Sequence, residues 1–171
     1  MRDSMIGGTR LLVQALKLLN LLVGIGFGIT LLVSFWEHGP LVAQLVLKYG
    51  AAHAGPILTG MRVMLAAGIL AVGVAYVFLR LLAEILATVA AGDPFIAENG
   101  VRLRRMGFAL LIYQLGDLAL GVIDHWLDLL GADTVPWFPS LGGWLVVLLL
   151  FVLARVFAVG AAMRDDLEGT V

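Results

Sequence analysis

Residues 141–163 read LGGWLVVLLLFVLARVFAVGAAM, an apolar run in which Arg155 is the only charged side chain. Roughly 20 helical residues cross the hydrocarbon core of a bilayer, which is about 30 Å thick. Lipid offers no hydrogen-bond partner to a free backbone amide, so a chain of this kind crosses it as a helix. The run therefore predicts a transmembrane helix.

Three stretches upstream have the same character, namely residues 11–36, 61–91 and 106–130. The first two are longer than a bilayer requires, which predicts tilt or projection into water. Of the 171 residues, 61% are hydrophobic and 13% are charged, whereas soluble domains carry about 25% charged residues. The first run is too long for a signal peptide, so we expect it to be retained. The sequence predicts an all-α, four-helix membrane bundle that forms a single transmembrane domain over residues 1–171.

The basic residues predict the orientation of these helices. Most of them fall at one set of helix ends, namely Arg2, Arg10, Lys17, Arg80, Arg102, Arg104, Arg105, Arg155 and Arg164. Only Lys48 and Arg62 fall at the other set. Because cytoplasmic ends carry the excess of basic residues, both termini are expected in the cytoplasm. The tryptophans are all expected at the outer ends, where their rings favour the interface: Trp36, Trp126, Trp137 and Trp144.

The two outer connections differ in pattern. In the first, residues 37–60, Pro40 and Gly50 can open and close a helix. This helix is expected either to lie on the outer leaflet or to pack over the mouth of the bundle. The second connection, GADTVPWFPS at residues 131–140, is expected to be an ordinary turn with an aromatic anchor.

A polar stripe runs through the third predicted span. Its members are separated by three or four residues, which is one face of a helix: Gln114, Asp117, Gly121, Asp124 and Asp128. Charged groups facing lipid are costly, so the stripe is expected to face the bundle interior. Asp117 falls near mid-membrane and needs a partner or a proton. We hypothesise an ion pair with Arg155 of the fourth span; the alternative is that Arg155 extends to the inner headgroups without reaching Asp117.

Two further patterns concern helix packing. Arg80 and Glu84 are four residues apart on the second span, which favours an ion pair on one helix face. Gly24 and Gly28 form a GxxxG motif in the first span, which is typical of close helix packing and is a candidate face for a homo-oligomer.

The sequence lacks the residues that several kinds of catalysis and metal binding require. With no cysteine, thiol catalysis and cysteine metal sites are excluded. The aspartates of the membrane lie on one helix, which argues against an intramembrane aspartyl protease, and no glycine-flanked motif surrounds Ser34. His38, His53 and His125 all map to the outer side, but their spacing is not a ligand motif, so they are only weak metal candidates. We expect no enzyme and no cofactor, and the net charge of −1 gives no sign of nucleic-acid binding.

The connection between the second and third spans reads AGDPFIAENGVRLRRMG at residues 91–107. Asp93 is a good N-cap and Pro94 suits the first helical position. A short amphipathic cytoplasmic helix is therefore expected, either running into the third span or broken at Gly100. Its residues of interest lie on adjacent turns: Phe95, Glu98, Asn99, Arg102, Leu103, Arg104 and Arg105. The arginines could also meet anionic lipid.

The C-terminal tail, GAAMRDDLEGTV at residues 160–171, combines basic and acidic groups: Arg164, Asp165, Asp166 and Glu168, followed by Thr170. Together with the segment above, it resembles a bacterial family of small membrane proteins known as domain of unknown function 2975. Members of that family have four spans, a GDPF…EN..RLR..G segment and a terminal G..LR.D.EGTV. Met163 departs from the pattern, since the family more often has leucine there.

The resemblance implies no established reaction. Many members of the family are encoded beside a small helix-turn-helix regulator, which implies a membrane partner that sequesters or signals to a transcription factor. The two motifs have a structural alternative, in which the acids of the tail pair with Arg102, Arg104 and Arg105 and close the inner end of the bundle.

The sequence thus favours a non-enzymatic membrane sensor or regulatory partner that engages a cytoplasmic protein. The rival interpretation is a small transporter or channel component, with Asp117 as its ion or proton site.

Overall fold

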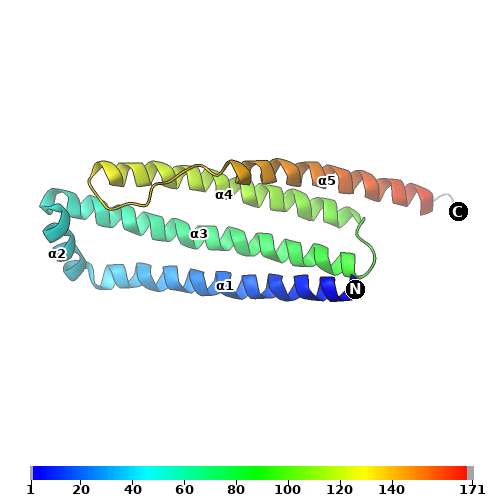
Figure 1. The fold of residues 1–171 in the computed structure, drawn as a ribbon, viewed down its shortest axis with the longest axis horizontal. Coiled ribbons are helices and arrows are strands. Elements are labelled where there is room, and N and C mark those ends of the chain that lie inside the picture. Colours follow the sequence, from blue (N-terminus) through cyan, green and yellow to red (C-terminus); the bar gives the residue numbers. More distant parts are fainter. Residues whose placement is uncertain (1, 169–171) are drawn as a thin grey trace. The chain divides into compact units, whose positions relative to one another are not determined.

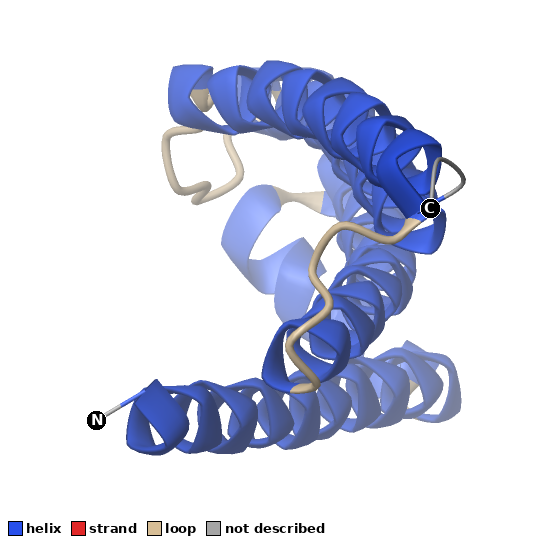
Figure 2. Cartoon of the chain, turned by 90° about the vertical axis from the view of Figure 1, so that its right-hand side faces the viewer, coloured by secondary structure: helices blue, strands red, loops and turns tan. Residues whose placement is uncertain are grey.

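The computed structural model describes residues 2–168, and side chains from residue 7 to residue 164 together with that of Asp166. This part of the chain is all-α, with five helices joined by short connections (Figures 1 and 2). Their bounds are α1 Arg2–Trp36, α2 His38–Tyr49, α3 Ala51–Ala90, α4 Ala97–Leu129 and α5 Leu141–Glu168.

Four of these helices are long and apolar enough to cross a membrane. The membrane-competent stretches are Gly7–Trp36, Ala51–Ala90, Ala97–Leu129 and Leu141–Arg164. They correspond one to one with the four predicted spans, so the prediction of a multi-pass membrane protein is confirmed. The remaining helix, α2, lies where Pro40 and Gly50 predicted one, although it begins at His38.

α3 begins ten residues before the predicted span, at Ala51 instead of residue 61. The helix includes Pro56, which stands near its start and cannot donate a hydrogen bond to the carbonyl of Ala52. Burial offsets this loss, because Ala54 and Ile57 on the same turns are almost fully buried. Packing therefore outweighs the local signal that proline gives.

α3 and α4 end in the same way. After α3, Asp93 N donates to Thr88 O at 3.0 Å and Gly92 N donates to Val89 O at 3.1 Å. This pair of bonds is a Schellman motif, which requires a left-handed residue, and Gly92 supplies it with φ +88°. The same two bonds recur around Gly131 at the end of α4, with φ +76°.

The start of α4 corrects one prediction. Asp93 and Pro94 do not open a short separate helix: residues 93–96 are non-helical, and the helix that begins at Ala97 continues to Leu129. Asp93 fails as a cap because its carboxylate pairs with Arg164. Of the two expected alternatives, the helix runs into the third span and is not broken at Gly100, whose backbone packs closely against α5 near Ala154.

The chain divides into two compact units. Unit 1 comprises Met1–Asn20, Val74–Gln114 and Ser140–Val171, and unit 2 comprises Leu21–Gly73 and Leu115–Pro139. α1, α3 and α4 each contribute one part to either unit, so neither unit is a continuous segment. The expected single domain stays a prediction.

Unit 1 has a core built from α3, α4 and α5. Its buried members are Leu81, Ile85, Leu103, Met106, Leu150 and Ala154. Phe108 and Phe151 meet edge to face across α4 and α5, with ring centroids 5.1 Å apart. Both terminal segments of the chain belong to this unit.

Unit 2 relies on small residues at its helix contacts. A Cβ added at Gly60 of α3 would lie 2.6 Å from a methyl of Leu127 in α4, and one at Gly24 of α1 would lie 2.8 Å from Val72 in α3. Gly28 meets nothing within 4 Å. One glycine of the GxxxG motif thus serves packing within the chain, which weakens the motif as a sign of a dimer.

The connection after α4 is not the ordinary turn that the sequence predicts. Within unit 2, Ala132 N bonds to Leu127 O at the end of α4. Trp137 packs on Gly121, eight residues before the last residue of α4 and so about 12 Å back along that helix. The connection therefore runs back along the C-terminal part of α4, because Gly121 leaves room for an indole ring against the helix backbone.

Candidate functional site

The connection between α3 and α4 in unit 1 is held by Asn99, whose side chain is fully buried at 0% exposure. Its Nδ2 donates to Thr88 Oγ1 at 2.7 Å and to Pro94 O at 2.8 Å, and its Oδ1 accepts from Arg102 Nη1 at 2.8 Å. One side chain thus ties the end of α3, the non-helical segment and the first turns of α4 together.

Two groups of ion pairs extend this network. Glu84 accepts from Arg80 at 3.1 Å and from Arg102 at 3.2 Å, so the Arg80–Glu84 pair that the spacing favours is present and is shared with α4. Asp93 pairs with Arg164 of α5. The C-terminal tail therefore contacts the α3–α4 connection through the basic side chain of Arg164, and this contact does not involve the acidic residues of the tail.

The other motif residues lie around this network. Phe95 packs on Phe157 of α5, with ring centroids 5.1 Å apart, and Leu103 is part of the core. Glu98, Arg104 and Arg105 are exposed. Asp166 is exposed as well, the side chains of Asp165 and Glu168 lie outside the described part, and Thr170 lies beyond residue 168.

Arg104 and Arg105 differ from the other arginines around this network in their ion pairs. Within residues 2–168, every described ion pair in unit 1 uses Arg80, Arg102 or Arg164. Neither Arg104 nor Arg105 has a carboxylate partner among the described side chains, which do not include those of Asp165 and Glu168. The predicted pairing of these two arginines with acids of the tail stays a prediction.

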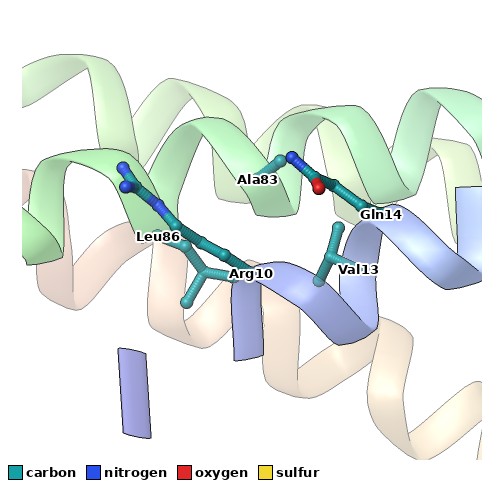
Figure 3. Close-up of a pocket in the computed structure, with 5 residues that line it drawn as sticks. All are labelled: Arg10, Val13, Gln14, Ala83 and Leu86. Carbon is teal, nitrogen blue, oxygen red and sulfur yellow. The ribbon is translucent and has the colours of Figure 1, made fainter. Parts of the chain in front are cut away.

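α1 and α3 leave a small apolar pocket between them in unit 1, of about 280 Å³. Figure 3 shows Arg10 and Gln14 of α1 extending across the pocket that Ala83 and Leu86 of α3 line. Val13 of α1 also lines the pocket and is 3% exposed. The pocket offers a hydrophobic slot with two polar side chains at its edge, and it gives no pair of groups suited to acid–base chemistry.

The polar stripe of α4 meets different surroundings along its length. In unit 1, Gln114 is 3% exposed and donates from Nε2 to Ser140 O at 3.2 Å. In unit 2, Gly121 is covered by Trp137, Asp124 is half-buried and Asp128 is exposed.

Asp117 is half-buried in unit 2, and Arg155 is exposed in unit 1. The Asp117–Arg155 ion pair stays a prediction.

The three histidines do not form a metal site in the described part of the chain, where no group of three metal-ligating side chains occurs. His38 Nδ1 lies 3.2 Å from Arg62 Nη2. His125 lies beside a cavity of about 650 Å³ between α4 and the α4–α5 connection, with Asp124, Asp128 and Trp137. The indole N–H of Trp137 is the one buried side-chain polar atom without a partner among the described residues.

A second cavity of about 650 Å³ lies in unit 2, where α1, α2, α3, α4 and the α4–α5 connection meet. We call it the Arg62 cavity. Most of its wall is apolar, including Ile57, Leu58 and Leu127, which are almost fully buried. This combination of size, apolar lining and few polar groups is typical of small-molecule sites.

Arg62 is the residue of this cavity that the sequence did not single out. Its Nε donates to Ser34 Oγ at 3.2 Å, its Nη2 donates to Ser34 O, and the guanidinium lies 4.1 Å from the centre of the Phe35 ring. Ser34 is thus bound to arginine and to Leu31 O, and no histidine activates it in the described structure. A single arginine eleven residues after the start of α3 gives no sequence signal for these contacts.

The second basic group of the cavity, Lys48 of α2, has an acid of its own. Its Nζ lies 2.6 Å from Asp133 Oδ2, and Tyr49 Oη lies 3.4 Å from the same oxygen. The hydrogen bond between the two raises the pKa of Lys48 above its ordinary range and lowers the pKa of Asp133. Both side chains are exposed, so this pair is screened by salt.

Comparison with known protein families, with curated proteins and with solved structures gives no match for this chain. The resemblance to the domain of unknown function 2975 therefore stays a prediction.

Proposed function

We propose that the chain is a non-enzymatic sensor or regulatory partner in a bacterial inner membrane, which engages a cytoplasmic protein through the first turns of α4. The observation that carries the proposal is the contrast among its arginines. Arg80, Arg102 and Arg164 are matched with carboxylates, whereas Arg104 and Arg105 are exposed and have no carboxylate partner among the described side chains. Unmatched arginines on a rigid helix suit binding to an acidic protein surface.

The support beneath these arginines favours docking. Asn99 fixes the connection with three hydrogen bonds, and the Asp93–Arg164 pair joins it to α5. A preorganised surface loses little conformational entropy on binding. The partner that fits best is a small helix-turn-helix regulator that presents an acidic face, as the family resemblance implies.

A topology experiment tests the first requirement, that α4 starts in the cytoplasm. The chain has no cysteine, so single cysteines report their own position. Glu98→Cys and Gly39→Cys both replace exposed residues, and a side chain at position 39 of α2 meets nothing within 4 Å. In intact cells a membrane-impermeant maleimide is expected to label position 39 and to label position 98 only after permeabilisation. The reverse pattern contradicts the proposal.

A pull-down tests the docking surface itself. The full chain carrying Arg104→Gln and Arg105→Gln is compared with Arg10→Gln, a control that removes an exposed arginine from α1. Both are solubilised from native membranes in neutral detergent, and bound proteins are identified by mass spectrometry. The double variant is expected to lose a helix-turn-helix protein by about tenfold or more, as for interface arginines in general. Equal capture by both variants refutes the docking role.

The alternative function, a transporter or channel component with Asp117 as its ion site, has less to support it. None of the three cavities described above is lined by Asp117. Ion flux into proteoliposomes that is abolished by Asp117→Asn would favour the alternative.

A further inference from the structure

The Arg62 cavity contains two charges of opposite sign that are not matched with each other. Arg62 of α3 and Asp124 of α4 both line it, yet they form no ion pair in the described part of the chain. Lys48 and Asp133 also line it, but they neutralise one another at 2.6 Å. The cavity therefore presents one available cation and one available anion.

Arg62 is held in a way that keeps its charge available. None of its contacts is to a carboxylate: they are to Ser34 Oγ and O, His38 Nδ1 and the ring of Phe35. These contacts use Nε and Nη2, which leaves the Nη1 hydrogens of the guanidinium without a described partner. An arginine that is held in place without a carboxylate partner is suited to bind a phosphate or carboxylate.

Asp124 of α4 lines another wall of the Arg62 cavity and supplies its negative charge. It is half-buried and makes no hydrogen bond or ion pair among the described residues. A half-buried carboxylate without a partner is costly, and an ammonium group with its three donors offsets that cost.

We propose that the Arg62 cavity binds a zwitterionic amphiphile, with its phosphate or carboxylate at Arg62, its primary ammonium at Asp124 and its apolar part against Ile57, Leu58 and Leu127. The volume of about 650 Å³ accommodates a headgroup and part of an acyl chain. The neutral Lys48–Asp133 pair adds no net charge that would favour a purely anionic ligand. The inference goes beyond the proposed function and does not rest on it, since it concerns unit 2 alone.

The test uses the full chain in a neutral maltoside detergent and native mass spectrometry to titrate three probes. Lysophosphatidylethanolamine carries the phosphate, the ammonium and a chain; lysophosphatidylglycerol lacks the ammonium; free phosphoethanolamine lacks the chain. We expect the first probe to bind about tenfold or more tightly than either of the others, because each lost group forfeits a charged hydrogen bond or the apolar contact. If the two lysolipids bind equally tightly, the ligand does not need an ammonium group and the zwitterion is overturned. If phosphoethanolamine binds as tightly as lysophosphatidylethanolamine, the ligand does not need an apolar chain and the amphiphile is overturned.

Variants assign the two charges. Asp124→Asn is expected to abolish the preference for the amine and leave binding of the glycerol lipid unchanged, and Asp128→Asn, one turn further on and outside this cavity, is the matched control. Arg62→Gln is expected to weaken both lysolipids by about tenfold or more. Arg62→Lys, which keeps the charge, is expected to retain part of the binding and guards against simple unfolding. A wild-type preference in Asp124→Asn, or wild-type binding in Arg62→Gln, overturns the assignment.

Discussion

Replacing Asn99 with alanine is the most informative perturbation of unit 1. The side chain is fully buried and makes three hydrogen bonds, two to neutral groups and one to the guanidinium of Arg102. A neutral hydrogen bond contributes about 1 kcal/mol and one to a charged group about 2 kcal/mol, so the sum is about 4 kcal/mol. Arg102 is partly exposed and can recover water, which brings the expected loss to about 2–4 kcal/mol.

The neighbouring Glu98→Ala variant serves as the control for Asn99→Ala. Glu98 is exposed in the same turn of α4, so its replacement by alanine leaves the hydrogen bonds of Asn99 in place. The free energy of unfolding is measured in mixed micelles by titration with a denaturing detergent, followed by tryptophan fluorescence. The variant Asn99→Ala is expected to lie about 2–4 kcal/mol below the control. A difference within about 0.5 kcal/mol would falsify the claim that Asn99 holds the connection.

The same substitution has a local consequence. Asn99 binds the carbonyl of Pro94, so its loss is expected to free the non-helical residues 93–96 from the start of α4. Hydrogen exchange in that segment should then rise while exchange in the core of unit 1 changes less. Uniform acceleration throughout unit 1 would instead indicate general destabilisation.

Two further predictions concern unit 2. Gly121→Ala places a Cβ about 2.5 Å from the ring of Trp137, so we expect a loss of about 1–3 kcal/mol in unfolding free energy. The control is Gly116→Ala on the same helix, whose Cβ meets nothing within 4 Å and which should be neutral or stabilising. Equal effects of the two substitutions would contradict the packing of Trp137 on Gly121. The Lys48 contact lowers the pKa of Asp133, so the pair contributes stability above the ordinary aspartate pKa of about 3.9 and loses it as the pH falls through the lowered value. The carboxyl carbon resonance of Asp133 should titrate below about 3.9 and move upward in Lys48→Gln, and a midpoint at or above that value rules the pair out.

The spans could be predicted because hydropathy accumulates over many residues. The predicted ends at residues 36, 91 and 130 and the predicted start at residue 141 lie within one residue of the observed helices. At Gly92 and Gly131 the sequence also carries the glycines that a left-handed cap requires. At Asp93 and Pro94 the local signal failed, since the tertiary ion pair with Arg164 outcompeted the cap.

The side-chain contacts of the candidate site could not be predicted from the sequence. Lys48 meets Asp133 and Arg62 meets Ser34, and each pair joins separate helices or connections. Such contacts depend on how far each helix is rotated and shifted along its axis, which hydrophobic periodicity does not determine to within one turn. Only the Arg80–Glu84 pair, which is internal to one helix, follows from spacing alone.

The two basic residues of the Arg62 cavity differ in their partners: Lys48 is paired with a carboxylate, whereas Arg62 is not. Lys48 is matched by Asp133, so a ligand anion would have to displace a carboxylate already at 2.6 Å. Arg62 is oriented by Ser34 and Phe35, which are neutral, so an arriving anion displaces nothing and meets a guanidinium already in position. Removing the carboxylate of Asp133 should therefore make Lys48 a second anion site and shift the cavity toward purely anionic amphiphiles. The selectivity of the cavity depends on that surface ion pair even though the pair itself contributes little to stability.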